Sequence, residues 1–233
     1  MDRSPALAER ARLRLPSPLA LAVAFVLLSA GGAFGWRLQT GAPSARPTPA
    51  VAAAALDLER TEAAPLCAPD GAESVRDRAL EGTSPGGGDR LAGYLPARSP
   101  LPGYDRAGAR AVDGATEVEF VAGAVDGHVA SFRPEGEGGF DVYAFRFLAR
   151  KDAAAAIADH VVRRVCDFGA APLAARGRPG LIVLEERRGA ERSSAWWMTR
   201  SDVIVVRYAA PPGEDAATSL ANLAAIAGAT ALY

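Results

Sequence analysis

The feature that most constrains this chain is an uncharged segment near its N-terminus. Leu15–Trp36 spans twenty-two residues without a charged side chain, and four arginines precede it: Arg3, Arg10, Arg12 and Arg14. A helix needs about 20 predominantly apolar residues to cross the hydrocarbon core of a bilayer. Two prolines interrupt the start of the segment, so the predicted spanning helix is Leu19–Trp36, which would contact the lipid bilayer.

Arginine is distributed unequally about this segment. Four arginines lie before it, whereas only Arg37 and Arg46 follow closely. The positive-inside rule therefore places residues 1–14 in the cytoplasm as a tail and makes residues 15–38 a signal-anchor of a single-pass cell-membrane protein. The alternative is a cleaved secretory signal with Leu19–Leu28 as its apolar core, followed by small residues suited to cleavage, in which case the protein is secreted. Apolar character that continues to Trp36 favours a retained anchor.

Composition divides the remaining chain into two parts. Residues 39–65 are rich in alanine and proline and predict a semi-extended linker. Residues 66–233 are long enough for one domain with its own core. They carry 22 acidic and 19 basic side chains, a net charge of −3, which gives no basic footprint for nucleic acid.

The chain contains two cysteines, Cys67 and Cys166. An exported domain is in an oxidising compartment, where an even number of cysteines predicts a disulfide. The alternative is a pair of buried thiols. Two cysteines and two histidines at unrelated spacings do not form a zinc pattern, and no phosphate-binding glycine motif is present, so no metal or cofactor is predicted.

Alternating and helical patterns divide the domain into strands and helices. Asp126-Gly127 is a favourable pair for a two-residue hairpin turn between the first two strands. Leu181–Leu184 is apolar at every position and predicts a strand covered on both faces. The expected strands are Glu117–Val125, His128–Arg133, Phe140–Leu148, Leu181–Arg187, Ser194–Arg200 and Val203–Ala209, with Ser201-Asp202 as the last turn.

Helical periodicity predicts two main helices. The first begins at Asp152 as N-cap and ends before Gly169, and the second runs from Glu214 to Gly228. A short helix is also expected at Ala72–Leu80. The order β-β-β-α-β-β-β-α with hairpin-length links predicts an α+β domain, an antiparallel sheet with two helices packed on one face.

One short motif resembles a known class of proteins. Leu95-Pro96 followed by Leu101-Pro102-Gly103-Tyr104 is similar to the segment that opens the extracytoplasmic domains of actinobacterial lipoproteins and kinase sensors. The anchor and the Pro/Ala-rich linker are similar too. The chain departs from the lipoproteins because it lacks their acylated cysteine, and from the kinases because it lacks a kinase domain. The resemblance implies an extracytoplasmic binding or accessory module, and it carries over no functional residue.

Three side chains are candidate contacts for a ligand or a partner. Trp196 and Trp197 are adjacent on a strand and point to opposite faces, so one of them is a candidate for stacking on a glycan or anchoring a protein. If helices cover both faces of the sheet, both rings belong to the core instead. His128 follows the predicted turn and is either a solvated turn residue or, near carboxylates, a general base or a pH sensor.

The second histidine and the remaining polar residues add no catalytic motif. His160 is placed about 120° from the centre of the apolar stripe of its helix and is expected to be exposed. The sequence therefore predicts a membrane-anchored binding, sensor or accessory domain of the cell envelope, with an envelope protein or glycan as partner, that acts without catalysis. The competing hypothesis is an envelope hydrolase whose site is assembled from distant residues. A cleft that holds a histidine beside a serine or carboxylate would favour the enzyme, and an exposed tryptophan would favour binding.

Overall fold

The computed structural model describes residues 56–82, 90–113, 121–186 and 193–230. Its helices are α3 (Gly71–Glu81), α5 (Arg150–Cys166) and α6 (Ala216–Thr230), with two short 3-10 helices, η1 (Ala64–Cys67) and η2 (Leu91–Tyr94). Its strands are β1 (Leu58–Arg60), β2 (Tyr104–Ala111), β3 (Asp126–Pro134), β4 (Gly139–Arg146), β5 (Ala171–Ala175), β6 (Arg178–Glu185), β7 (Ser193–Thr199) and β8 (Asp202–Ala209). The chain is thus an α+β protein, as predicted.

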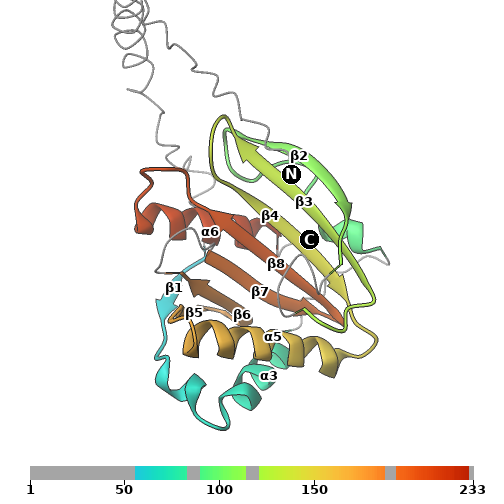
Figure 1. Ribbon diagram of the computed structural model, residues 1–233, viewed down its shortest axis with the longest axis vertical. Coiled ribbons are helices and arrows are strands. Elements are labelled where there is room, and N and C mark those ends of the chain that lie inside the picture. The colour runs from blue at the N-terminus through green and yellow to red at the C-terminus, as the bar shows by residue number, and fades with distance from the viewer. Residues whose placement is uncertain (1–55, 83–89, 114–120, 187–192, 231–233) are drawn as a thin grey trace, which may run out of the picture. The chain divides into compact units, whose positions relative to one another are not determined.

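The strands form one antiparallel sheet of eight strands in the order β1-β5-β6-β7-β8-β4-β3-β2 (Figure 1). Six strands were expected from the sequence, and five of them are found as β3, β4, β6, β7 and β8. The three strands that were not expected are short or lack alternation: β1 has three residues, β2 is exposed at every position after Tyr104, and β5 is an Ala-Pro-Leu-Ala-Ala segment. β1 pairs with β5 and lies inside the segment we interpret as linker, so the sheet begins before residue 66.

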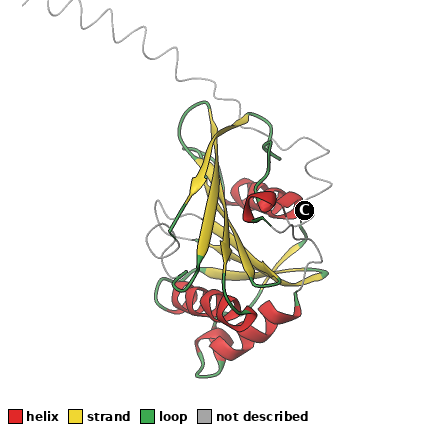
Figure 2. Ribbon diagram, turned by 90° about the vertical axis from the view of Figure 1, so that its right-hand side faces the viewer, coloured by secondary structure: helices red, strands yellow, loops and turns green. Residues whose placement is uncertain are grey.

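Helices cover both faces of the sheet, which corrects the expectation of a single helical face. α3 and α5 pack on one face, over residues such as Ile182, Trp196 and Val205. α6 and η2 pack on the other, over residues such as Val183 and Trp197. Figure 2 shows α6 on the opposite side of the sheet from the α3–α5 pair. The arrangement follows from β6, β7 and β8, whose side chains are apolar on both faces and therefore need cover on both sides.

The prediction of a hairpin turn at Asp126-Gly127 is wrong. Asp126 and Gly127 are the first residues of β3 rather than a turn, and β3 pairs with β2. Gly127 is required by close packing: a Cβ there would lie 2.6 Å from the carbonyl oxygen of Val112 and 2.8 Å from the ring of Phe145. The expected strand at Glu117–Val125 is also not found in its described part, since residues 121–125 are irregular, and residues 117–120 lie outside the described residues.

The last hairpin is shifted by one residue from its expected position. Thr199 pairs with Asp202, so Arg200 and Ser201 form the turn and Asp202 opens β8. Arg200 has φ 56°, the left-handed conformation that a two-residue hairpin turn requires. Leu181–Leu184 lies in β6 and is buried on both faces, as the sequence predicted.

The two main helices begin and end close to the predicted positions. The N-cap of α5 is Ala149 rather than Asp152, which lies in the first turn of the helix. Gly169, with φ 73°, ends the helix with a hydrogen bond from its N–H to the carbonyl of Val165 (3.2 Å). In α6, seven consecutive residues from Asn222 to Gly228 are buried, because the helix is covered on more than the stripe that faces the sheet.

The end of α3 touches β6 directly through backbone. An added Cβ at Gly82 would lie 2.0 Å from the Cα of Gly180, and one at Gly180 would lie 2.2 Å from the Cα of Gly82. Only a pair of glycines permits this approach. The contact fixes where α3 crosses the sheet and therefore how its outer face is presented.

None of the helices in the described residues is long and apolar enough to span a membrane. The predicted anchor at Leu19–Trp36 lies outside the described residues, so it stays a prediction. The segment that resembles actinobacterial domains is described: Leu95, Leu101 and Tyr104 are all buried on the face that α6 covers.

Candidate functional site

The two tryptophans singled out in the sequence lie in the two cores. Trp196 is 1% exposed on the α5 side and Trp197 is 5% exposed on the α6 side. The indole N–H of Trp196 donates to the hydroxyl of Ser194 (2.9 Å). In this structure neither ring is offered to a ligand, because helices cover both faces of the sheet.

His128 lies near the start of β3 and is one-third exposed. Its Nε2 is 3.5 Å from the carboxylate of Asp126, which is half exposed. Both side chains belong to one strand and sit two residues apart on the same face. The pair is a solvated ion pair when the imidazole is protonated.

His160 is buried rather than exposed, which corrects the sequence prediction. It is 8% exposed, and its ring lies against the indole of Trp196 with centroids 4.1 Å apart. The apolar stripe of α5 is wider than the one read from the sequence, because α3 packs against this helix in addition to the sheet. The described residues therefore show neither the exposed tryptophan that would favour binding nor the histidine-containing cleft that would favour an enzyme. The described tryptophans are buried, and His128 lies outside the hollow on α3 that is described below.

The predicted disulfide is present. The sulfur atoms of Cys67 and Cys166 are 2.02 Å apart and join the end of η1 to the last residue of α5. Both cysteine residues are exposed to solvent. The bridge therefore ties the N-terminal part of the described chain to a helix that lies 99 residues further along.

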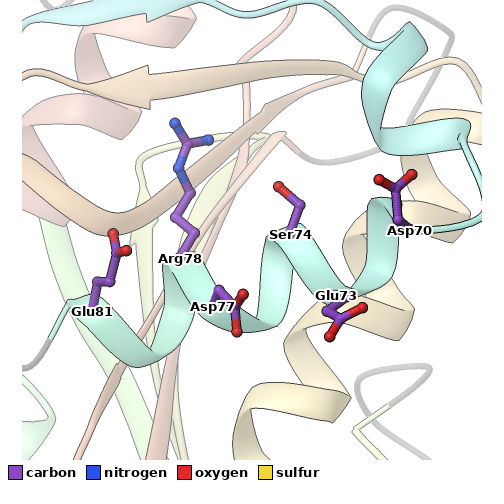
Figure 3. A pocket seen from close by; sticks show the side chains of 6 residues that line it. All are labelled: Asp70, Glu73, Ser74, Asp77, Arg78 and Glu81. Atoms are coloured by element: carbon purple, nitrogen blue, oxygen red, sulfur yellow. The ribbon is translucent and has the colours of Figure 1, made fainter.

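A shallow, open hollow of about 460 Å³ lies along the outer face of α3. Figure 3 shows its six described lining side chains, all carried by α3 and the residue before it: Asp70, Glu73, Ser74, Asp77, Arg78 and Glu81. Their spacing of three, four and seven residues is that of one helix face, and it opposes the buried residues Val75 and Ala79. Four carboxylates and one guanidinium give this face a net charge of −3.

A polar network below α6 was not visible in the sequence. The hydroxyl oxygens of Tyr104 and Tyr208 are 3.0 Å apart, and the Tyr208 hydroxyl lies 2.9 Å from both carboxylate oxygens of Glu214. The amide nitrogen of Asn222 is 3.0 Å from the same hydroxyl. Because Tyr208 has one proton, which Glu214 accepts, its oxygen accepts from Tyr104 and Asn222. This buried hydroxyl is fully satisfied.

Burial governs the protonation of this network. Desolvation by burial is the main reason that the pKa values of both Tyr104 and Tyr208 are raised. Desolvation also raises the pKa of Glu214, although Tyr208 and Asn222 oppose the shift by donating to its carboxylate. The tyrosines therefore remain protonated donors. Their effect is to hold the loop before α6 against β2 and β8.

A second buried polar group lies at the opposite end of β8. The guanidinium of Arg146 donates to both carboxylate oxygens of Asp202, at 2.9 and 3.0 Å, and the hydrogen bond to Asp202 raises the pKa of Arg146. Tyr94 of η2 is 5% exposed and lies near Asp202. Burial, followed by the negative charge of Asp202, raises the pKa of Tyr94. Tyr94 and Leu91 of η2 are both buried in the core on the α6 side of the sheet.

Among the described residues, no three His, Cys, Asp or Glu side chains lie close enough together to hold a metal ion. Comparisons with protein-family models, with curated proteins and with solved structures find no match for this chain. The resemblance to actinobacterial extracytoplasmic domains therefore rests on the residues quoted above and stays a hypothesis.

Proposed function

We propose that this chain is a membrane-anchored, extracytoplasmic binding or accessory domain that acts by surface contact rather than by catalysis. The observation that carries the location is the disulfide between Cys67 and Cys166, which is exposed to solvent. Exposed disulfides persist in oxidising compartments and are reduced in the cytoplasm. The uncharged segment Leu19–Trp36, preceded by arginines, supplies the anchor and the orientation.

The proposed mode of action depends on which surfaces of the domain are accessible to a partner. Helices cover both faces of the sheet, and both tryptophans among the described residues belong to the core. One hollowed surface is the outer face of α3, with its net charge of −3. A shallow surface with this charge suits contact with a cationic segment of another envelope protein, because its open carboxylates can reach a partner without enclosing it.

The location is tested by labelling membrane vesicles of known sidedness. The phosphine TCEP and a charged maleimide, neither of which crosses a membrane, are added to right-side-out and inside-out vesicles that contain the full chain. Because Cys67 and Cys166 are the only cysteines, labelling reports the side on which the domain lies. We expect labelling only in right-side-out vesicles. Labelling only in inside-out vesicles would place the domain in the cytoplasm and end the proposal.

The contact is tested with a photo-crosslinking amino acid in cells of the host. Ser74 lies in the hollow and is uncharged, so it can be replaced without changing the charge of α3. Ala109, exposed on β2, is the matched control position. We expect a discrete adduct at position 74 that is lost in the variant Glu73→Gln/Asp77→Asn. Absence of an adduct at position 74, or one that the charge variant leaves unchanged, would contradict contact through α3.

A further inference from the structure

The Cys67–Cys166 bridge has surroundings that set it apart from a purely structural crosslink. Cys67 ends η1 and Cys166 ends α5, and both residues are exposed. A thiolate in solution can therefore approach the bridge without unfolding of the domain. Exposed disulfides are the ones that react by thiol–disulfide exchange in folded proteins.

An exposed aromatic ring follows Cys166 in the chain, and two guanidinium groups lie near that ring. Phe168, two residues after Cys166, is 40% exposed. The guanidinium carbon of Arg164 lies 4.4 Å from the centre of the Phe168 ring, and that of Arg163 lies 5.9 Å from it. Arg163 is also three residues before Cys166 on the same helix, the spacing at which side chains are neighbours. Positive charge at this position favours a thiolate on Cys166 and offsets the unfavourable C-terminal end of α5.

We propose that the Cys67–Cys166 bridge is a thiol–disulfide exchange site of the folded protein, and that a dithiol reductant is its reaction partner. A thiolate of the reductant attacks the Sγ of Cys67, the Cys67–Cys166 bond breaks, and Cys166 leaves as a thiolate beside Arg163. The second thiol of the reductant then attacks the mixed disulfide and releases Cys67. The reductant loses two electrons and becomes a disulfide, and its two protons end on Cys67 and Cys166.

Opening of the bridge has a local consequence in the fold. The apolar side chains that then hold η1 to the α3–α5 side are Ala63 and Leu66, both only partly buried, and the Leu66 backbone stays close to Gly71. β1 remains held by its pairing with β5, and the end of α3 remains held by Gly82 against Gly180. Reduction therefore loosens the segment from Ala64 to the first turn of α3, which carries the start of the acidic face, and leaves the sheet intact.

The exchange reaction is tested on the full chain in mild detergent, with dithiothreitol as the reductant. The fraction reduced is measured by the gel shift of a maleimide–polyethylene glycol adduct, and folding is followed by the near-ultraviolet circular dichroism of the tryptophans. We expect the reduction rate to rise in proportion to dithiothreitol concentration while the dichroism is unchanged. A rate that saturates at the rate of unfolding would overturn the proposal, because the bridge would then react only in the unfolded chain.

A charge variant tests the role assigned to the surroundings. We expect Arg163→Gln to slow reduction about twofold to fivefold, an effect that 1 M salt diminishes. The matched control is Arg106→Gln on β2, at the far edge of the sheet, which should leave the rate unchanged. Equal rates in both variants would remove Arg163 from the mechanism and contradict the proposal.

Hydrogen exchange measured by mass spectrometry tests the local consequence. Protein held reduced in TCEP is compared with the oxidised protein. We expect faster amide exchange in residues 64–75 and unchanged protection in β6, β7 and β8. Unchanged exchange in residues 64–75 would overturn the loosening. These experiments use purified protein, so their outcome is independent of the vesicle test of location and of the crosslinking test of contact.

Discussion

Removal of the disulfide by the variant Cys67→Ser/Cys166→Ser gives the sharpest test of how this fold is stabilised. The bridge joins cysteines 99 residues apart and so closes a loop of about 100 residues in the unfolded chain. In the chain-entropy model, a loop of about 100 residues contributes about 4.7 kcal/mol at 25 °C. Natural domains have unfolding free energies of roughly 5–15 kcal/mol, so the bridge accounts for a large share of the total.

The expected result is a free energy of unfolding lower by up to about 4.7 kcal/mol. For a domain of roughly 150–250 residues, about 1 kcal/mol corresponds to 2–4 °C in Tm, so Tm should fall by roughly 10–20 °C. Residual structure in the unfolded chain reduces both values, because it already holds part of the loop together. Folding itself should persist, since the sheet and both cores do not include the cysteines.

The assay is urea unfolding of the full chain in mild detergent, followed by near-ultraviolet circular dichroism of the buried tryptophans. The matched control is wild-type protein reduced with TCEP, which removes the crosslink without changing a residue. The reduced wild type and the double serine variant should unfold at the same urea concentration. If the variant lies within about 1 kcal/mol of the oxidised wild type, the loop-closure reasoning is wrong for this protein.

Three further predictions follow from the packing and protonation described above. Gly82→Ala should destabilise the protein by roughly 1–3 kcal/mol or more, because its Cβ would lie 2.0 Å from the backbone of Gly180. The control Gly93→Ala should be nearly neutral, because an added Cβ there meets nothing within 4 Å. Thermal unfolding of the two variants distinguishes them. The raised pKa of Glu214 means that its contribution to stability is present below the ordinary carboxyl pKa of 4.5 and is lost as pH rises through the folded-state pKa. Urea unfolding across this pH range should therefore show a weaker loss of stability in Glu214→Gln than in the wild type, and identical pH dependences would refute the assignment. Trp197→Ala should lower the free energy of unfolding by roughly 3–5 kcal/mol, because the ring belongs to the core. If chemical unfolding shows that the variant is as stable as the wild type, Trp197 becomes a candidate ligand contact again.

Local patterns predicted the elements that form over many residues. The helices α5 and α6 and the strands β6, β7 and β8 follow from sustained apolar patterns, and the short helix expected at Ala72–Leu80 is found as α3. The disulfide between Cys67 and Cys166 followed from an even cysteine count together with the predicted export. These features were readable because each depends on the composition of one segment or on simple chemistry.

The features that the sequence left hidden depend on residues far apart in the chain. Asp126-Gly127 has the composition of a turn, but its glycine is needed because the Phe145 ring and the Val112 carbonyl approach it. His160 lies beside the apolar stripe of its own helix and is buried because α3 and the sheet both pack on α5, with Trp196 of the sheet against its ring. The network of Tyr104, Tyr208 and Glu214 joins β2, β8 and the loop before α6, and no local sequence pattern predicts it.

The sequence by itself determined the apolar N-terminal segment, the α+β class and the pairing of the two cysteines, because these depend on local composition and on covalent chemistry. Only the tertiary structure decided that helices cover both faces of the sheet. That arrangement buries Trp196 and Trp197, whereas the acidic face of α3 and the Cys67–Cys166 bridge are among the described groups that stay exposed. The physical reason is that burial is a property of what packs against a residue, and those partners come from distant parts of the chain.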